Sequence, residues 1–128
     1  MFFYEKWDVF KAAVRMREIA QELSQYQTPQ TASDLDQLRR SASSCPLNIG
    51  EGARERTPKK KLDRYGTSRA SAGEFNACLI ILEPNLPRRA QPLIVEGKEV
   101  ADRTSAMLTN LMRSTQRRAD DDKNGTSA

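Results

Sequence analysis

Histidine is absent from this chain of 128 residues, and cysteine occurs only twice. Without histidine, the sequence excludes metal sites built on imidazole and catalytic pairs of serine or cysteine with histidine. Cys45 and Cys78 are too few for a disulfide framework and too isolated for a zinc site, so we expect two buried free thiols. The sequence therefore predicts no metal, no cofactor and no catalytic residue.

Glycine, proline and aromatic residues are also scarce. Six glycines, six prolines and an aromatic content of 6% favour a helical fold over a β-sandwich. Apolar runs stay well below the roughly 18 residues that a membrane span needs, so we expect no membrane association. The N-terminus mixes acids and a lysine with its apolar residues, unlike a secretion signal, so we expect a cytoplasmic protein.

The net charge of +4 is distributed unevenly along the chain. Residues 1–37 carry a net charge of −2, residues 38–70 a net charge of +6, and residues 71–128 a net charge of zero. The positive excess therefore lies in the middle segment. The nine basic side chains of this segment are Arg39, Arg40, Arg54, Arg56, Lys59, Lys60, Lys61, Arg64 and Arg69.

Apolar residues recur at spacings of three and four in four segments, which predicts four amphipathic helices. The expected helices cover about residues 4–26, 33–52, 57–83 and 93–117. The residues expected to face the core are Val9, Ala12, Met16, Ile19, Leu23 and Tyr26 in the first helix, Leu35, Leu38, Ala42, Cys45 and Ile49 in the second, Leu62, Tyr65, Ala72, Phe75, Leu79 and Leu82 in the third, and Ile94, Val100, Thr104, Met107, Leu111 and Thr115 in the fourth.

The helix boundaries follow from residues that start or stop helices. Ser33 or Asp34 is the expected N-cap of the second helix, and Gly52 its expected end. Thr57 followed by Pro58 predicts the start of the third helix, because a capping hydroxyl and proline at the first helical position favour helix initiation.

Pro46 lies inside the apolar period of the second helix. Proline cannot donate a backbone hydrogen bond, and its ring crowds the preceding turn. The period continues through Pro46, so we interpret it as a kink within one helix. The alternative is a pair of short helices that meet at this proline.

These segments predict an all-α fold, an antiparallel up-down-up-down four-helix bundle over residues 1–118. Residues 119–128 are acidic and polar with nothing to bury, so we expect a disordered tail. If the hairpin of the second and third helices folds about residues 54 and 55, Cys45 lies beside Arg64. The same pairing places Asn48 beside Lys61, and Arg40 beside Arg69.

Part of the sequence resembles a known protein family. Residues 38–65 read LRRSASSCPLNIGEGARERTPKKKLDRY, and residues 71–74 read SAGE. They resemble the four-helix-bundle proteins named after the intervening sequences of 23S ribosomal RNA, whose pattern is close to QIRRAAxSIPxNIAEG followed by SxxE. The matching positions are Trp7, Gln37, Arg39, Arg40, Pro46, Asn48, Ile49, Glu51, Gly52, Arg64, Tyr65, Ser71 and Glu74. The chain departs from the pattern at Cys45 and Gly50, where the family has isoleucine and alanine.

The resemblance implies a cytoplasmic bacterial protein that assembles as a ring-shaped homopentamer. Relatives include the accessory variability determinants of diversity-generating retroelements, which are basic pentamers that bind nucleic acid and a reverse transcriptase. The resemblance therefore implies nucleic acid, further copies of the chain and a reverse transcriptase as partners, and an accessory role beside that enzyme or in a process related to ribosomal RNA.

The nine basic residues are the candidate nucleic-acid-binding site, because clustered lysine and arginine release counterions from phosphates. The alternative is a solvated face that keeps the protein soluble. Tyr65 is the one aromatic residue interleaved with them, and we assign it to the core. The sequence therefore gives no support to base stacking and predicts binding that is largely independent of sequence.

A second hypothesis is a structural or adaptor homo-oligomer that binds a protein partner and no nucleic acid. In this interpretation Asn48, Glu51 and Glu74 make internal or inter-subunit polar contacts, because a buried charge needs a partner. Glu51 could pair with Arg54 on its own helix or with a residue across a subunit boundary. The expected hairpin places Glu51 and Glu74 too far apart for acid/base catalysis or a shared metal, so we expect no enzyme.

Overall fold

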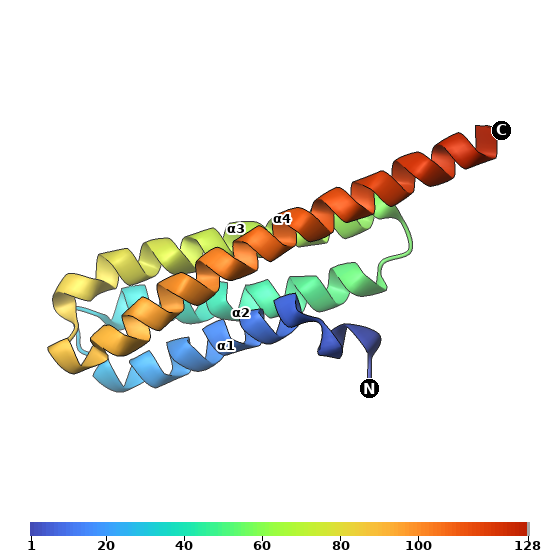
Figure 1. Ribbon diagram of the computed structural model, residues 1–128. Helices are drawn as coiled ribbons and strands as arrows, with labels where there is room; N and C mark the ends of the chain where they lie inside the picture. Colours follow the sequence, from blue (N-terminus) through green and yellow to red (C-terminus); the bar gives the residue numbers. More distant parts are fainter. Residues whose placement is uncertain (128) are drawn as a thin grey trace.

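Four α-helices dominate the computed structural model, which describes the backbone of residues 1–127 and the side chains of residues 1–125 (Figure 1). They are α1 (Asp8–Leu23), α2 (Ala32–Arg54), α3 (Pro58–Leu82) and α4 (Gln91–Ser127). Short 3-10 helices flank them: η1 (Phe3–Lys6), η2 (Ser24–Tyr26), η3 (Glu83–Asn85) and η4 (Arg88–Ala90). Residues 1–127 contain no strand, which confirms the predicted all-α class. No helix within this range has the length and apolar character to cross a membrane.

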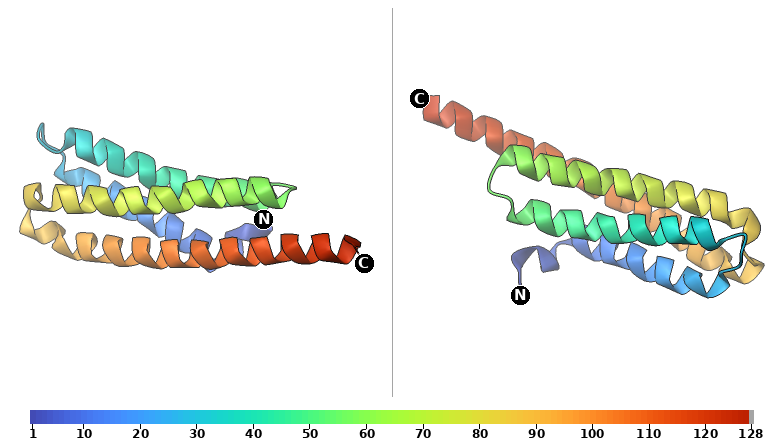
Figure 2. Two further views of the ribbon diagram at one scale, coloured as in Figure 1. Left: turned by 90° about the horizontal axis from the view of Figure 1, so that it is seen from above. Right: turned by 180° about the vertical axis from the view of Figure 1, so that it is seen from behind.

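The helices pack side by side around one core. The closest neighbours are α2 and α3, followed by α3 with α4, α1 with α2, and α1 with α4. At one end of the molecule, the α2–α3 connection lies near the N-terminus and the C-terminal half of α4 (Figures 1 and 2). The α1–α2 and α3–α4 connections lie together at the opposite end (Figure 2). The basic α2–α3 turn is therefore next to both terminal segments of the chain.

The apolar stripes read from the sequence form the core, as predicted. Every residue expected to face inward is buried except four that are half-buried: Tyr26, Leu62, Met107 and Leu111. Both cysteines are free thiols and buried, as expected. Burial is the reason that the pKa of the Cys45 thiol is raised to about 11.

The first helix begins later than predicted, at Asp8 rather than near residue 4. Trp7 has an extended backbone, which separates the single turn of η1 from α1. The ring of Tyr4 then folds back onto α2, where a Cβ on Gly50 would lie 3.2 Å from it. The period-based prediction failed here because aromatic residues at helical spacing also occur in a segment that turns away from the helix axis.

The second helix starts and ends outside the predicted limits. Its N-cap is Thr31 rather than Ser33 or Asp34, and its last residue is Arg54 rather than Gly52. Gly52 has no positive φ, so it does not terminate the helix in a left-handed conformation. Instead it lets α3 come close: a Cβ on Gly52 would lie 2.6 Å from the ring of Tyr65. The glycine is therefore a packing residue.

The pairing of α2 with α3 is shifted by about one helical turn from the prediction. Cys45 lies beside Ser68, whose hydroxyl donates to the Cys45 carbonyl over 2.7 Å, and not beside Arg64. Ser44 lies beside Ser71, with 2.8 Å between their hydroxyl oxygens. The shift arises because α2 extends to Arg54, which moves the turn toward the start of α3.

The helix α2 continues through Pro46, which excludes the alternative of two short helices. Pro46 is buried and follows a run of small residues. The bend at Pro46 stays a prediction. The start of α3 is as predicted, because the Thr57 side chain accepts a hydrogen bond from the backbone N–H of Lys60 over 3.3 Å and Pro58 is the first helical residue.

The fourth helix extends well past its predicted end at residue 117. It runs to Ser127, through the segment that the sequence analysis assigns to a disordered tail, and only Ala128 of that tail lies outside the described residues. Residues 116–125 are almost entirely exposed, so core packing does not hold this part of the helix. A hydrogen bond from Gln116 to Asp120 over 3.0 Å links successive turns, and no proline follows Pro92.

Candidate nucleic-acid interface

The α2–α3 turn carries three cations that have no polar partner among the described residues. Arg56, Lys59 and Lys60 are exposed, and within residues 1–125 no hydrogen bond or ion pair engages their side chains. Thr57 and Pro58 fix the start of α3, so the two lysines lie in its first turn. Cations at a helix N-terminus are unfavourable for the helix, since its dipole is positive there. Their position therefore serves no evident purpose in helix stability.

Lys61 has a structural role instead. Its ammonium group donates to the carbonyls of Gly52 and Ala53, over 3.3 Å and 2.9 Å. These carbonyls belong to the last turn of α2, where backbone acceptors lack helical partners and a cation complements the dipole. Lys61 therefore fastens the end of α2 to the start of α3.

Arg64 is committed to carboxylates on α2 and the turn. It forms ion pairs with Glu51 over 3.0 Å and with Glu55 over 3.7 Å. The partner of Glu51 is thus Arg64 on the next helix, and not Arg54 on its own helix as the minimal prediction had it. Arg54 lies instead over the ring of Phe2, 4.8 Å from its centroid.

The remaining predicted arginines lie along the hairpin and are also engaged. Arg40 pairs with Asp36 over 3.3 Å and donates to Gln37 over 2.7 Å. Arg39 donates to Ser24 over 2.9 Å, which ties α2 to the end of α1. Arg69 lies on the other side of the bundle and donates to Thr109 of α4 over 3.2 Å. The contacts of Arg40 and Arg69 are solvent-exposed, so these two arginines can exchange partners, whereas that of Arg39 is partly buried.

A shallow hollow on the outer face of α2 brings five of the predicted residues together. Its volume is about 520 Å³, and its rim includes both cations and a carboxylate. The predicted residues that line it are Arg39, Arg40, Asn48, Glu51 and Arg64. Leu47 lies among them with 63% of its surface exposed. This surface, which we call the α2 face, combines an apolar centre with a charged rim.

The other two predicted polar residues, Asn48 and Glu74, also have partners within the hairpin. The Asn48 amide donates to the carbonyl of Ser44 over 2.9 Å and to its hydroxyl over 3.1 Å. The carboxylate of Glu74 accepts a hydrogen bond from Gln37. Glu74 and Glu51 therefore have separate partners at different levels of the hairpin. Residues 1–125 contain no group of three or more side chains arranged to hold a metal ion.

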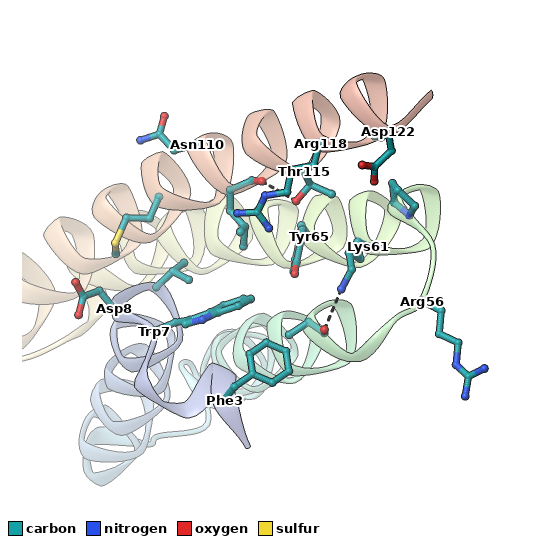
Figure 3. Close-up of a pocket in the computed structure, with 16 residues that line it drawn as sticks. Phe3, Trp7, Asp8, Arg56, Lys61, Tyr65, Asn110, Thr115, Arg118 and Asp122 are labelled. Carbon is teal, nitrogen blue, oxygen red and sulfur yellow. Dashed lines mark hydrogen bonds between the residues drawn. The ribbon is translucent and has the colours of Figure 1, made fainter. Parts of the chain in front are cut away.

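A pocket opens at the same end of the bundle as the α2–α3 turn (Figure 3). Arg56 and Lys61 line it together with Arg118 of α4 and with Trp7, from the extended residue before α1. Arg118 is not among the predicted residues, because the segment 71–128 is neutral as a whole. Counted separately, residues 103–119 contain four arginines and no acid, and this is the signal that could have found it.

A comparison with protein families gives the same family as the motif in α2 and α3. A family model described as "23S rRNA-intervening sequence protein" matches residues 5–110. The matched region starts in η1 and ends in α4, so it includes α1, α2 and α3 in full. A comparison with curated proteins gave no match. The chain is thus a member of the 23S rRNA-intervening sequence protein family.

Proposed function

We propose that this protein is a non-catalytic, basic helical bundle that binds the phosphate backbone of RNA or DNA. Its scaffold in this proposal is an antiparallel up-down-up-down bundle with a kink at Pro46. The observation that carries the proposal is the set of three exposed cations at the α2–α3 turn, Arg56, Lys59 and Lys60, whose side chains make no hydrogen bond or ion pair in the described part of the chain. The family name, which refers to ribosomal RNA, favours RNA as the partner.

The binding energy would come mainly from counterion release. Each cation that meets a phosphate displaces a condensed counterion, and log affinity falls with log salt by about 0.9 for each such contact on duplex DNA. Phosphate contacts carry no sequence information, so binding at the turn is independent of sequence. The paired arginines of the hairpin contribute less, because they first have to leave Glu51, Glu55 or Asp36.

Retardation of labelled duplex RNA and DNA over a range of salt concentrations tests this function. The double variant Lys59→Ala/Lys60→Ala should flatten the plot of log affinity against log salt by about 2, because two phosphate contacts are lost. The control is Arg88→Ala/Arg103→Ala, which removes two exposed cations away from the turn. It should leave the slope close to that of the native protein.

Lys61 is excluded from the variant because it holds the end of α2. Equal slopes for the native protein and the Lys59/Lys60 variant would refute the placement of the site. Binding that does not change with salt in the native protein would refute the proposed function itself. Sequencing of nucleic acid that co-purifies with the protein identifies its partner.

The α2 face supports a second candidate function, that of a homo-oligomeric adaptor. Leu47 exposes 63% of its surface at the centre of a charged rim, an arrangement typical of protein interfaces. In this proposal the chain forms a homopentamer in the cytoplasm and acts as an accessory factor to a reverse transcriptase or in a process related to ribosomal RNA. Both functions can coexist, because the α2 face and the turn use different residues.

Light scattering at micromolar concentration tests this second function. The native protein should have the mass of an oligomer, and Leu47→Glu should lower it toward that of one chain. Ile80→Glu is the matched control, since Ile80 is another exposed aliphatic residue but lies on α3 outside the α2 face. A native protein with the mass of one chain would contradict the adaptor. An Ile80 variant that dissociates while the Leu47 variant does not would contradict the α2 face as the interface.

A further inference from the structure

The pocket beside the α2–α3 turn has the size and composition of a small-molecule site. Its volume is about 690 Å³, within the usual range for ligand pockets. Figure 3 shows that four separate parts of the chain enclose it: the N-terminal segment, the end of α2, the start of α3 and the C-terminal half of α4. A ligand held there would touch residues that are far apart in the sequence.

One wall of the pocket is aromatic and apolar. Trp7 and Phe3 line it, and their rings meet edge to face with 5.5 Å between the centroids. This contact holds the indole of Trp7 in place at the pocket wall (Figure 3). Met107 and Leu111 of α4 add aliphatic surface. A flat aromatic ligand could therefore stack on a preformed surface.

The opposite wall provides a hydrogen-bond donor. Tyr65 is only 1% exposed, and within residues 1–125 its hydroxyl has no hydrogen-bond partner. In Figure 3 this hydroxyl points into the pocket, toward the side on which Trp7 lies. Burial raises the pKa of Tyr65 to about 12, so the hydroxyl keeps its proton at neutral pH and can donate.

The rim of the pocket attracts anions. Three cationic side chains, Arg56, Lys61 and Arg118, line it against two carboxylates, Asp8 and Asp122. The guanidinium of Arg118 lies close enough to Tyr65 to oppose the rise of its pKa. The rim is also continuous with the exposed cations of the turn, because Arg56 belongs to both.

We propose that this pocket binds one nucleotide of a single strand, with its base stacked on Trp7 and its phosphate held by Arg118. The inference rests on the proposed function, which brings a nucleic-acid backbone to the adjoining turn. The shared chemistry is a planar base that carries a phosphate, so a free mononucleotide also fits. A base inside a duplex is stacked and paired, and it would have to leave the helix to enter. The pocket should therefore favour single strands.

Trp7 is the only tryptophan of the chain, so its fluorescence reports directly on a base in this pocket. The native protein is titrated with adenosine 5′-monophosphate, with single-stranded oligodeoxyadenylate and with a duplex that has the same number of phosphates. We expect saturable quenching by both single-stranded ligands, tighter for the oligonucleotide, and retardation without quenching for the duplex.

Two variants test the residues. Tyr65→Phe keeps the ring that packs against Gly52 but removes the donor, and it should weaken single-strand binding about 2- to 10-fold without changing duplex binding. Tyr26→Phe, at the opposite end of the bundle, is its control and should change neither. Arg118→Gln on the exposed part of α4 should weaken binding of the mononucleotide, whose phosphate it holds.

The outcomes separate this inference from the proposed function. Salt-dependent duplex binding without quenching by either single-stranded ligand would overturn the pocket and leave the backbone site standing. Equal quenching by the duplex would also overturn it, since a paired base cannot stack on Trp7. If the native protein bound none of these ligands, both the pocket and the proposed backbone site would be overturned. Unchanged single-strand affinity in both pocket variants would refute the assigned residues.

Discussion

Replacing Gly52 by alanine should destabilise the protein, because α2 and α3 touch at this position. A Cβ added to Gly52 would lie 2.6 Å from Cε1 and 2.8 Å from Cδ1 of Tyr65, and 3.0 Å from Cβ of Arg64. Carbon atoms in contact prefer separations of about 3.5–4.0 Å, so the Tyr65 ring would have to retreat by about 1 Å. That ring is fully buried and cannot move into solvent.

The size of the effect follows from two opposing contributions. Alanine gains about 1 kcal/mol over glycine within a helix, whereas overpacking a closely packed site costs about 1–3 kcal/mol. Gly52→Ala should therefore change the free energy of unfolding by between about 0 and −2 kcal/mol. Gly73 provides the matched control on α3, since a Cβ there would have no neighbour within 4 Å. Gly73→Ala should raise the stability by about 0.5–1 kcal/mol.

Urea unfolding followed by circular dichroism at fixed protein concentration measures both variants. The decisive quantity is the difference between them, because both remove a glycine from a helix and the contribution of the unfolded chain cancels. We expect the Gly73 variant to exceed the Gly52 variant by about 1–3 kcal/mol. If Gly52→Ala stabilised the protein as much as Gly73→Ala, the close approach of Tyr65 to α2 would be wrong.

Three further predictions concern electrostatics and capping. Glu96→Gln should cost about 0.5 kcal/mol, measured by urea unfolding, and less in high salt, because the Glu96 ion pair with Arg15 (2.7 Å) is partly exposed. The Arg15 hydrogen bond lowers the pKa of Glu96, so this contribution is present above the ordinary carboxyl pKa and is lost as the pH falls below it. At alkaline pH the stability should instead fall as the pH rises above about 9, because burial raises the pKa of Cys45 to about 11 and that of Tyr65 to about 12. Cys45→Ala should reduce the loss of stability between pH 9 and 11. Thr57→Ala should cost about 1 kcal/mol in thermal unfolding through loss of the α3 N-cap, and an unchanged midpoint would contradict that role.

The helical periods identified which residues meet in the core, because burial depends on the face of a helix and the period defines that face. Leu35, Leu38, Ala42, Cys45 and Ile49 are all fully buried, as their spacing predicts. The period says little about where a helix stops. The prediction therefore failed at helix ends that depend on tertiary contacts, as with Trp7, whose extended backbone separates η1 from α1.

The register of the hairpin shows how one boundary error propagates. A glycine such as Gly52 is a typical sequence signal of a helix end, yet here it allows the Tyr65 ring of α3 to pack closely against α2. Placing the end two residues early moved the turn and shifted the expected neighbours on α3 by about one helical turn. The predicted register consequently did not pair Glu51 with Arg64, its partner in the structure, although both residues belong to the motif shared with the family.

The candidate site was only half visible in the sequence. The cations of the turn, Arg56, Lys59 and Lys60, lie within five residues of the sequence and could be counted directly. Trp7 and Arg118 are more than forty positions away from them in the sequence, and only the packing of α1 and α4 against the hairpin brings Trp7 and Arg118 to one pocket with Arg56. The sequence therefore argued against base stacking, whereas the structure places a tryptophan beside the basic turn.

The exposed C-terminal part of α4 places charges of both signs beside the α2–α3 turn. Residues 116–125 rise about 15 Å along the helix axis as a mostly exposed rod, and the end of α4 projects beyond the α2–α3 turn (Figures 1 and 2). The rod begins with Arg117 and Arg118 and continues with three consecutive carboxylates, Asp120 to Asp122. A polyanion at the turn would be attracted to the two arginines at the base of this segment and repelled by the carboxylates beyond them, so we expect it to cross this end of the bundle near Arg118 rather than follow α4 outward.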